Sequence, residues 1–239
     1  MTIRDLTPTN VWEIFYQLTR VPRPSKHEEK VRAFLLDWAK ERNIEAFQDK
    51  TGNVIMRVPA TPGYENKKGI VFQGHMDMVP QKNADKVHDF ENDPIETWVD
   101  GDWLKAKGTT LGADNGLGLA LGMAILESKD IEHGPVELLA TYDEETGMSG
   151  AMALEPGILN GEILINLDSE EEGELCIGCA GGLDATATDK YTINSQKWYN
   201  VTDDREMKVS IKRFGDTGTA IAIPFTVIKS LKTFNSSFV

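Results

Sequence analysis

Six His and carboxylate side chains of this chain stand where apolar runs end or begin: His75, Asp77, Asp114, Glu144, Glu145 and Asp168. Imidazole and carboxylate groups are the ligands that zinc and similar divalent ions take in proteins. Carboxylates that crowd together repel one another unless a positive charge lies among them. These residue types therefore indicate a site for two metal ions that performs hydrolysis.

Each signal is weak when it is taken alone. A pair such as His75 and Asp77 is usually a hydrogen-bonded surface pair, and an Asp that opens a helix, as Asp114 does, is usually a favourable N-terminal charge. Adjacent glutamates usually belong to a solvated face. Those ordinary explanations do not predict that all four segments would follow an apolar strand run or open an apolar helix. They also do not predict glycine beside site residues, as in Gly112-Ala-Asp114-Asn-Gly116 and Glu145-Thr-Gly147.

Apolar periodicity predicts the elements that position these residues. A 3.6-residue spacing predicts helices over 10–20 and after Ser25, which forms an expected capping box with Glu28. A Gly- and Ala-rich helix is expected to run from Asp114 to Leu126, close to a sheet, and a short one near 149–155. Trp98 and Trp103 flank an expected hairpin turn at 100–102. Strands are predicted at 44–48, 53–59, 69–75, 135–142 and 162–168.

Alternating strands and helices predict an α/β fold, with a mixed, largely parallel sheet flanked by helices. Functional sites of such sheets form at the carboxyl ends of the strands. His75 and Asp77 end one predicted strand, Glu144 follows another and Asp168 ends a third. We therefore expect these side chains to meet in one crevice.

Composition narrows the class of partner. The 239 residues carry a formal net charge of -13, which argues against nucleic acid or an anionic membrane as a partner. The N-terminus shows no apolar signal core and no run reaches about 18 apolar residues, so a cytoplasmic protein is expected. Cys176 and Cys179 have CxxC spacing without a second pair, and we interpret them as reduced, structural cysteines.

A change in charge divides the chain near residue 189. Residues 1–188 carry a net charge of -16 and residues 189–239 a net charge of +3. The apolar stretch 219–228 of the second segment is broken by Pro224. We interpret 1–188 as the amino-terminal part of a catalytic domain and 189–239 as a divergent tail, of frameshifted or truncated origin or a short substitute domain.

Five motifs carry a resemblance to a known family. The chain resembles the di-zinc metallopeptidase superfamily of dipeptidases, aminoacylases and carboxypeptidases, and within it the bacterial aminoacyl-histidine (Xaa-His) dipeptidases. The resemblance covers about residues 1–188. Its motifs are Gly74-His-Met-Asp-Met-Val79, Thr109-Thr-Leu-Gly-Ala-Asp-Asn-Gly116, Asp143-Glu-Glu-Thr-Gly147, Asn166-Leu-Asp168 and Gly178-Cys-Ala-Gly-Gly-Leu-Asp184.

The resemblance implies a role for each site residue. Asp114 would bridge two zinc ions, His75 and Asp168 would complete one of them, and Glu145 would bind the other. Asp77 would orient His75 through its second ring nitrogen. Glu144 would be the general base for a metal-bridged water that cleaves a dipeptide. The peptide bond between Asp114 and Asn115 would be cis. Manganese and cobalt share these ligand types with zinc.

Other family features match no segment of this chain. They are a lid or dimerisation domain, through which the family forms homodimers, and a late His ligand. His27, His88 and His133 match no family motif and are interpreted as structural or surface residues. Three functions stay open: dipeptide hydrolysis, metal binding by an inactive fragment, and a sibling activity such as N-acyl amino-acid deacylation or tripeptide cleavage.

Overall fold

A five-stranded sheet organises the first of two units into which the chain divides, Met1–Glu170 and Glu171–Val239. The computed structural model describes residues 1–169, 182–192 and 204–214. The predicted boundary at residue 188 stays a prediction. In the second unit, β8 (Gly182–Thr192) pairs antiparallel with β9 (Asp204–Phe214).

The first unit contains most of the predicted elements within a few residues of their expected bounds. Its helices are η1 (Ile3–Asp5), α1 (Thr9–Thr19), α2 (Glu29–Glu41), α3 (Ala113–Glu127), α4 (Glu144–Gly147) and α5 (Ser149–Met152). Its strands are β1 (Glu45–Gln48), β2 (Val54–Val58), β3 (Ile70–His75), β4 (Thr97–Asp100), β5 (Trp103–Ala106), β6 (Val136–Thr141) and β7 (Ile163–Asn166). Strands β4 and β5 form the predicted hairpin.

Strand order in the sheet is β1-β2-β6-β3-β7. Strand β3 pairs in parallel with β6 on one side and with β7 on the other, whereas β2 pairs antiparallel with both β1 and β6. Four of the five strands therefore run in one direction, which confirms the mixed, largely parallel sheet. Because β6, β3 and β7 are parallel neighbours, their carboxyl ends lie together at one edge.

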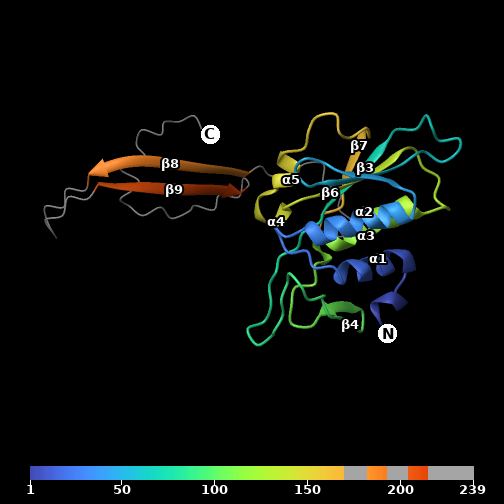
Figure 1. Cartoon of the computed structure of the whole chain (residues 1–239), viewed down its shortest axis with the longest axis horizontal. Helices are drawn as coiled ribbons and strands as arrows, with labels where there is room; N and C mark the ends of the chain where they lie inside the picture. Colours follow the sequence, from blue (N-terminus) through green and yellow to red (C-terminus); the bar gives the residue numbers. More distant parts are fainter. Residues whose placement is uncertain (170–181, 193–203, 215–239) are drawn as a thin grey trace. The chain divides into compact units, whose positions relative to one another are not determined.

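Helices α1, α2 and α3 lie together on one face of the sheet (Figure 1) and bury the larger core against it. Phe15 and Leu18 of α1, Leu35 of α2 and Met123 of α3 are fully buried there with Leu138 of β6. Burying one such side chain stabilises a fold by roughly 1.5–3 kcal/mol. This core stabilises the sheet whose strand ends carry the site loops.

The opposite face of the sheet is covered by less helix than the sequence predicts. Ile55, Val71 and Leu139 form its core, packed against Phe47 of β1 and against Leu154, Ile158 and Leu159, which follow α5. Helix α5 ends at Met152, short of the predicted 155, because Pro156 and Gly157, with a φ of 80°, cannot continue it. Irregular chain therefore covers much of this face.

The predicted capping box before α2 is wrong. Glu28 itself precedes the first helical residue, and no side chain caps the helix. The Ser25 backbone N–H instead donates to the Met78 carbonyl at 3.3 Å, and Pro24 forms a β-bridge with Met78. Segment 23–25 is therefore bound to the chain just beyond β3, which removes Ser25 from the helix start.

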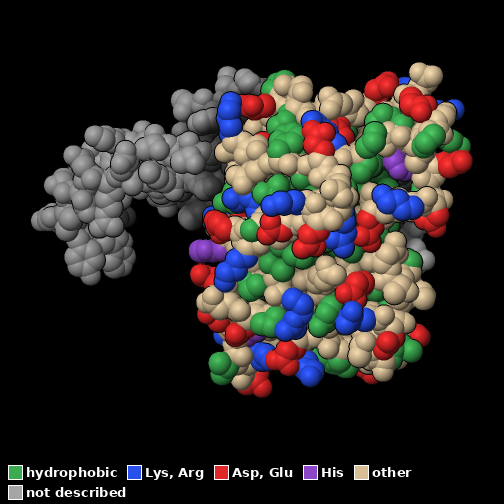
Figure 2. Space-filling view, turned by 45° about the vertical axis from the view of Figure 1, so that its right-hand side comes forward, with side chains coloured by type: hydrophobic (Ala, Val, Ile, Leu, Met, Phe, Trp, Pro, Cys, Tyr) green, Lys and Arg blue, Asp and Glu red, His purple; other side chains and the backbone are tan. Residues whose placement is uncertain are grey.

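Charged side chains of both signs are mixed over the face of the molecule seen in Figure 2. Acidic and basic side chains are therefore interspersed on this face. Within the described part of the chain, no helix is long and apolar enough to cross a membrane.

The close contact between α3 and β6 leads to a stability prediction. A Cβ added at Gly122 would lie 2.6 Å from Leu138 Cδ1, so Gly122→Ala overpacks the core. We expect a loss of about 1–3 kcal/mol in the free energy of unfolding, measured by urea denaturation. Gly147→Ala is the control, because its Cβ would meet only Ser149 Oγ, at 3.9 Å. Equal stability of the two variants would contradict the close packing.

Candidate metal centre

Three adjacent strand ends and one helix start bring the predicted site residues together. His75 is the last residue of β3, Glu144 and Glu145 begin α4 three residues after β6, and Asp168 lies two residues beyond β7. Asp114 lies at the start of α3, where Asp114 and Asn115 have non-helical backbone angles and the bond between them is cis, as the resemblance implies. Strand order therefore explains why the three segments that follow β3, β6 and β7 meet.

The imidazole of His75 forms the floor of this cluster. Its Nε2 atom lies 2.9 Å from Asp114 Oδ1, 3.7 Å from Asp168 Oδ1 and 4.0 Å from Glu144 Oε2. The His75 side chain is 1% exposed and that of Asp114 is 58% exposed. The cluster is therefore closed beneath and open above, where a substrate could enter.

The donor set fits divalent metal ions. Two groups of three side chains have ligand atoms within 4.8 Å of one another: His75 with Asp114 and Glu145, and His75 with Glu144 and Asp168. Ligand atoms about 2.0–2.1 Å from a tetrahedral zinc ion lie about 3.3 Å apart. The distances of 2.9 and 3.7 Å from His75 Nε2 bracket that separation.

Asp77 is fully buried and binds two parts of the site at once. Its Oδ1 lies 3.2 Å from His75 Nδ1, and the Asp77 backbone carbonyl lies 3.1 Å from the same nitrogen. Its carboxylate also accepts the backbone N–H groups of Glu144 at 3.1 Å and Glu145 at 3.2 Å. This bonding leaves His75 Nε2 facing the other carboxylates and places the two glutamates.

Asn115 is a site residue to which the sequence motifs assigned no contact. Its side-chain amide donates to the Leu167 carbonyl at 2.7 Å and to Asp168 Oδ1 at 2.9 Å, so it holds Asp168 in place. A Cβ added at Gly74 would lie 2.1 Å from Asn115 Oδ1, so only glycine fits immediately before His75. The sequence signal was present in Gly74 and Asn115, but only their contact reveals the role.

A second acidic group, also missed, lies beneath the site. Buried Glu28, Asp77 and Asp143 have carboxylate oxygens within 4.8 Å of one another. Glu28 Oε1 accepts the Asp143 backbone N–H at 3.2 Å, whereas Glu28 Oε2 is buried without a hydrogen-bond partner among the described residues. Burial and, to a smaller extent, the nearby Asp77 carboxylate raise the pKa of Glu28 to about 6. Glu28 thus retains a proton more readily than a solvated glutamate.

The metal-free site also holds protons. Burial alone would lower the pKa of His75, but its hydrogen bonds with Asp77 and Asp114 outweigh burial and raise it to about 9. Burial raises the pKa of Asp168 to about 6 against the opposing charge of His75. Burial and the charge of Asp114 raise the pKa of Glu145. A bound cation would replace these protons, since metal ligands must be deprotonated.

The other candidate residues lie away from this cluster or outside the described residues. His27 is 57% exposed and lies 4.0 Å from Glu91, His88 stacks edge-on against Phe90, and His133 lies beside the Gly134 carbonyl. Neither three-residue group around His75 contains any of them. Cys176, Cys179 and the stretch 219–228 fall outside the described residues.

Comparison with known proteins agrees with this geometry. The model of peptidase family M20/M25/M40 matches residues 71–217. The chain is 51% identical to the cytosol non-specific dipeptidase of Escherichia coli (strain K12) over 185 residues, which are 77% of this chain and 38% of that protein. It is 52% identical to the crystal structure of aminoacylhistidine dipeptidase from Vibrio alginolyticus, with a TM-score of 0.76, over 82% of this chain and 40% of that one.

A more distant structure shares the fold alone. The dinuclear metal-binding M20 peptidase of Bacillus subtilis is 19% identical with a TM-score of 0.52, over 87% of this chain and 65% of that one. The present chain spans less than half of the length of either dipeptidase.

The raised pKa of Glu28 predicts a pH-dependent stability in the metal-free chain. The pKa of Glu28 in the folded chain, about 6, lies above the ordinary value of 4.5, so folding favours the neutral acid. The contribution of the neutral acid to the free energy of unfolding is therefore lost as the pH rises from about 4.5 to 6. Glu28→Gln resembles the neutral acid at every pH. We expect wild type to lose about 2 kcal/mol relative to Glu28→Gln between pH 4.5 and pH 7, measured by urea unfolding in EDTA.

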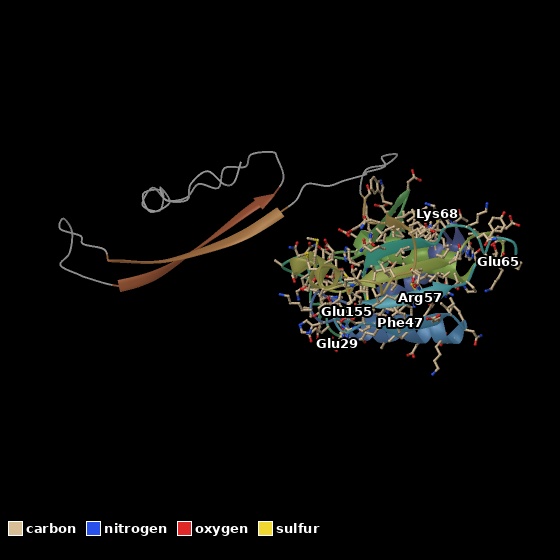
Figure 3. All side chains as sticks on the ribbon, turned by 90° about the horizontal axis from the view of Figure 1, so that it is seen from above. Glu29, Phe47, Arg57, Glu65, Lys68 and Glu155 are labelled. Atoms are coloured by element: carbon tan, nitrogen blue, oxygen red, sulfur yellow. The ribbon has the colours of Figure 1, made fainter. Side chains whose placement is uncertain are left out.

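The control for this measurement is Glu29→Gln, at the exposed first position of α2 (labelled in Figure 3). Its stability relative to wild type should change little over the same pH interval. A pH-independent difference between wild type and Glu28→Gln would show that Glu28 folds as an ordinary carboxylate.

Proposed function

This chain belongs to peptidase family M20/M25/M40, and we propose that its site binds two divalent metal ions, zinc foremost, and hydrolyses the peptide bond of dipeptides. The observation that carries the proposal is the convergence of one imidazole and four carboxylates at three strand ends and a helix start. Dipeptide hydrolysis is the activity named for the two longer relatives, and this chain spans only part of their length.

The metal ligands are assigned as follows. Asp114 would be shared by the two ions, because its exposed carboxylate lies nearest to His75 Nε2 and within 4.8 Å of Glu145. His75 and Asp168 would hold the first ion with it, and Glu145 would hold the second. Manganese or cobalt would accept the same ligands. Asp77 keeps the proton on His75 Nδ1 and thereby leaves Nε2 free to bind.

Divalent ions bound here would lower the pKa of a water molecule and polarise the peptide carbonyl. The residues of the chain then supply the proton transfers. Glu144 is the general base, because it lies beside the ligands, with Oε2 4.0 Å from His75 Nε2, and it is partly exposed to the open side. It accepts a proton from the attacking water and delivers it to the leaving amine. The Asp77 carboxylate holds the Glu144 backbone in position for this step.

The substrate class follows from the relatives. One is a non-specific dipeptidase and the other an aminoacylhistidine dipeptidase, so a dipeptide with a C-terminal histidine is the first substrate to test. The E. coli relative is a cytosol enzyme, and we expect the same compartment for this chain.

Metal binding without turnover is the second candidate. It is favoured by the ligand count, because His75 is the one histidine among the described residues that lies in either three-residue group. In the proposed assignment, the second ion then has only Asp114 and Glu145 as ligands among the described residues. Metal stoichiometry measured together with turnover separates the two candidates. One tightly bound ion and no cleavage of an Xaa-His dipeptide would support the second.

Chelation should destabilise the folded chain. The crowded carboxylates repel one another once the cations are removed, and a ligand present at about 1,000 times its Kd stabilises by about 4 kcal/mol. We therefore expect EDTA to lower the Tm by about 10 °C, measured by circular dichroism at neutral pH. EDTA that has been preloaded with zinc is the control. An unchanged Tm in free EDTA would contradict a metal centre.

The adjacent glutamates should behave differently when each is changed to glutamine. Glu144→Gln removes the base but no ligand, so we expect turnover to fall at least about 100-fold while zinc binding is retained. Glu145→Gln removes a ligand, so zinc affinity should fall together with activity. Zinc titration calorimetry and hydrolysis of an Xaa-His dipeptide measure both quantities. Full turnover by Glu144→Gln would refute the base assignment.

A further inference from the structure

Arg23 places a buried positive charge directly behind the metal centre. It lies in the segment between α1 and α2, is 2% exposed, and forms part of neither group of candidate ligands. Its Nη1 donates to the backbone carbonyls of Met76 at 3.0 Å and Asp77 at 2.8 Å. Its Nη2 donates to the Gly112 carbonyl. One guanidinium group thus joins the chain after β3 to the turn before α3.

Two glycines make room for this guanidinium. A Cβ added at Gly112 or at Gly116 would lie 2.6 Å from Arg23 Nη2. Gly112 also has a φ of 69°, which disfavours any side chain. These glycines flank Asp114, so the turn that carries the proposed bridging ligand is shaped around Arg23. The contact with Arg23 therefore explains why glycine stands on both sides of Asp114.

The charge of Arg23 also belongs to the electrostatics of the site. Burial lowers its pKa to about 10, while the nearby Asp77, Asp114 and Glu145 carboxylates oppose that change. The side chain therefore stays cationic at neutral pH. Its planar fork can donate to several acceptors in fixed directions, which the compact ammonium of lysine cannot reproduce.

We propose that Arg23 is a positioning residue of the metal centre, which sets the separation between His75 at the end of β3 and Asp114 at the start of α3. The inference rests on the proposed metal-binding function. Arg23 touches neither side chain. It acts through the carbonyls of Met76, Asp77 and Gly112, which lie on the two segments that bear these ligands. Without the fork, the distance of 2.9 Å between His75 Nε2 and Asp114 Oδ1 is no longer enforced.

The test is zinc titration of the full 239-residue chain carrying Arg23→Lys, which keeps the charge and removes the fork. Residues that orient metal ligands typically contribute about 10–100-fold to metal affinity, and we expect a loss in that range. Arg23→Gln removes the charge as well, and because a buried cation beside the site opposes zinc binding, its loss of zinc affinity should be smaller than that of Arg23→Lys. The Tm of each chain in EDTA is measured alongside, so that metal affinity and general stability are separated.

Arg57 provides a matched control. Its guanidinium is less enclosed than that of Arg23 but likewise joins separate segments, donating to Glu137 Oε1 at 2.6 Å and to the Ile158 carbonyl. Arg57 lies on β2 near Phe47, as Figure 3 shows. Its guanidinium carbon lies over the Phe47 ring, 4.9 Å from the ring centroid. Arg57→Lys should lower the Tm in EDTA and leave zinc affinity within about 2-fold of wild type, because it contacts neither ligand-bearing segment.

The outcomes separate the inference from the proposed function. If the wild-type chain binds no zinc, the metal centre itself fails. If wild type binds zinc and Arg23→Lys binds it equally tightly, the positioning role is overturned. Equal losses of zinc affinity in Arg23→Lys and Arg57→Lys would likewise overturn it, and so would failure of both Arg23 variants to fold in excess zinc, since Arg23 would then serve the whole fold.

Discussion

The geometry of the candidate metal centre depends on the hydrogen bonds of one buried carboxylate, that of Asp77. It lies against His75 Nδ1 and accepts the backbone N–H groups of Glu144 and Glu145, so it joins β3 to the start of α4. A carboxylate with no access to water holds such partners strongly, because the alternative is an unpaired buried charge. The orientation of the imidazole and the positions of both glutamates are therefore set by the same group.

The crowding of negative charge is the second constraint. Four carboxylates surround His75, and Glu28 and Asp143 lie beneath them with Asp77. In the metal-free chain, this crowding contributes to the raised pKa values of Glu28, Glu145 and Asp168, and the cationic His75 and Arg23 offset part of the negative charge. Metal ions would neutralise the same charges, so metal binding, proton release and folding stability are coupled.

The rigid scaffold makes this arrangement possible. Strand β3 lies between β6 and β7, and helices α1, α2 and α3 bury the core on one face of the sheet. Gly74 leaves room for the Asn115 side chain, and Gly112 and Gly116 leave room for the Arg23 guanidinium. The motif glycines therefore belong to the packing of the site, although none of them offers a ligand.

The sequence by itself predicted the α/β class, most strand positions and the six residues that the structure brings together, because apolar periodicity and residue chemistry are local properties. It could not identify Arg23, Glu28 or Asn115, and it assigned Ser25 to a helix cap that does not form. These residues act through contacts with chain 50 or more residues away, such as those of Arg23 with Met76 and Gly112. Tertiary structure alone decided them, because a buried polar group takes its partners from whatever the folded chain brings beside it.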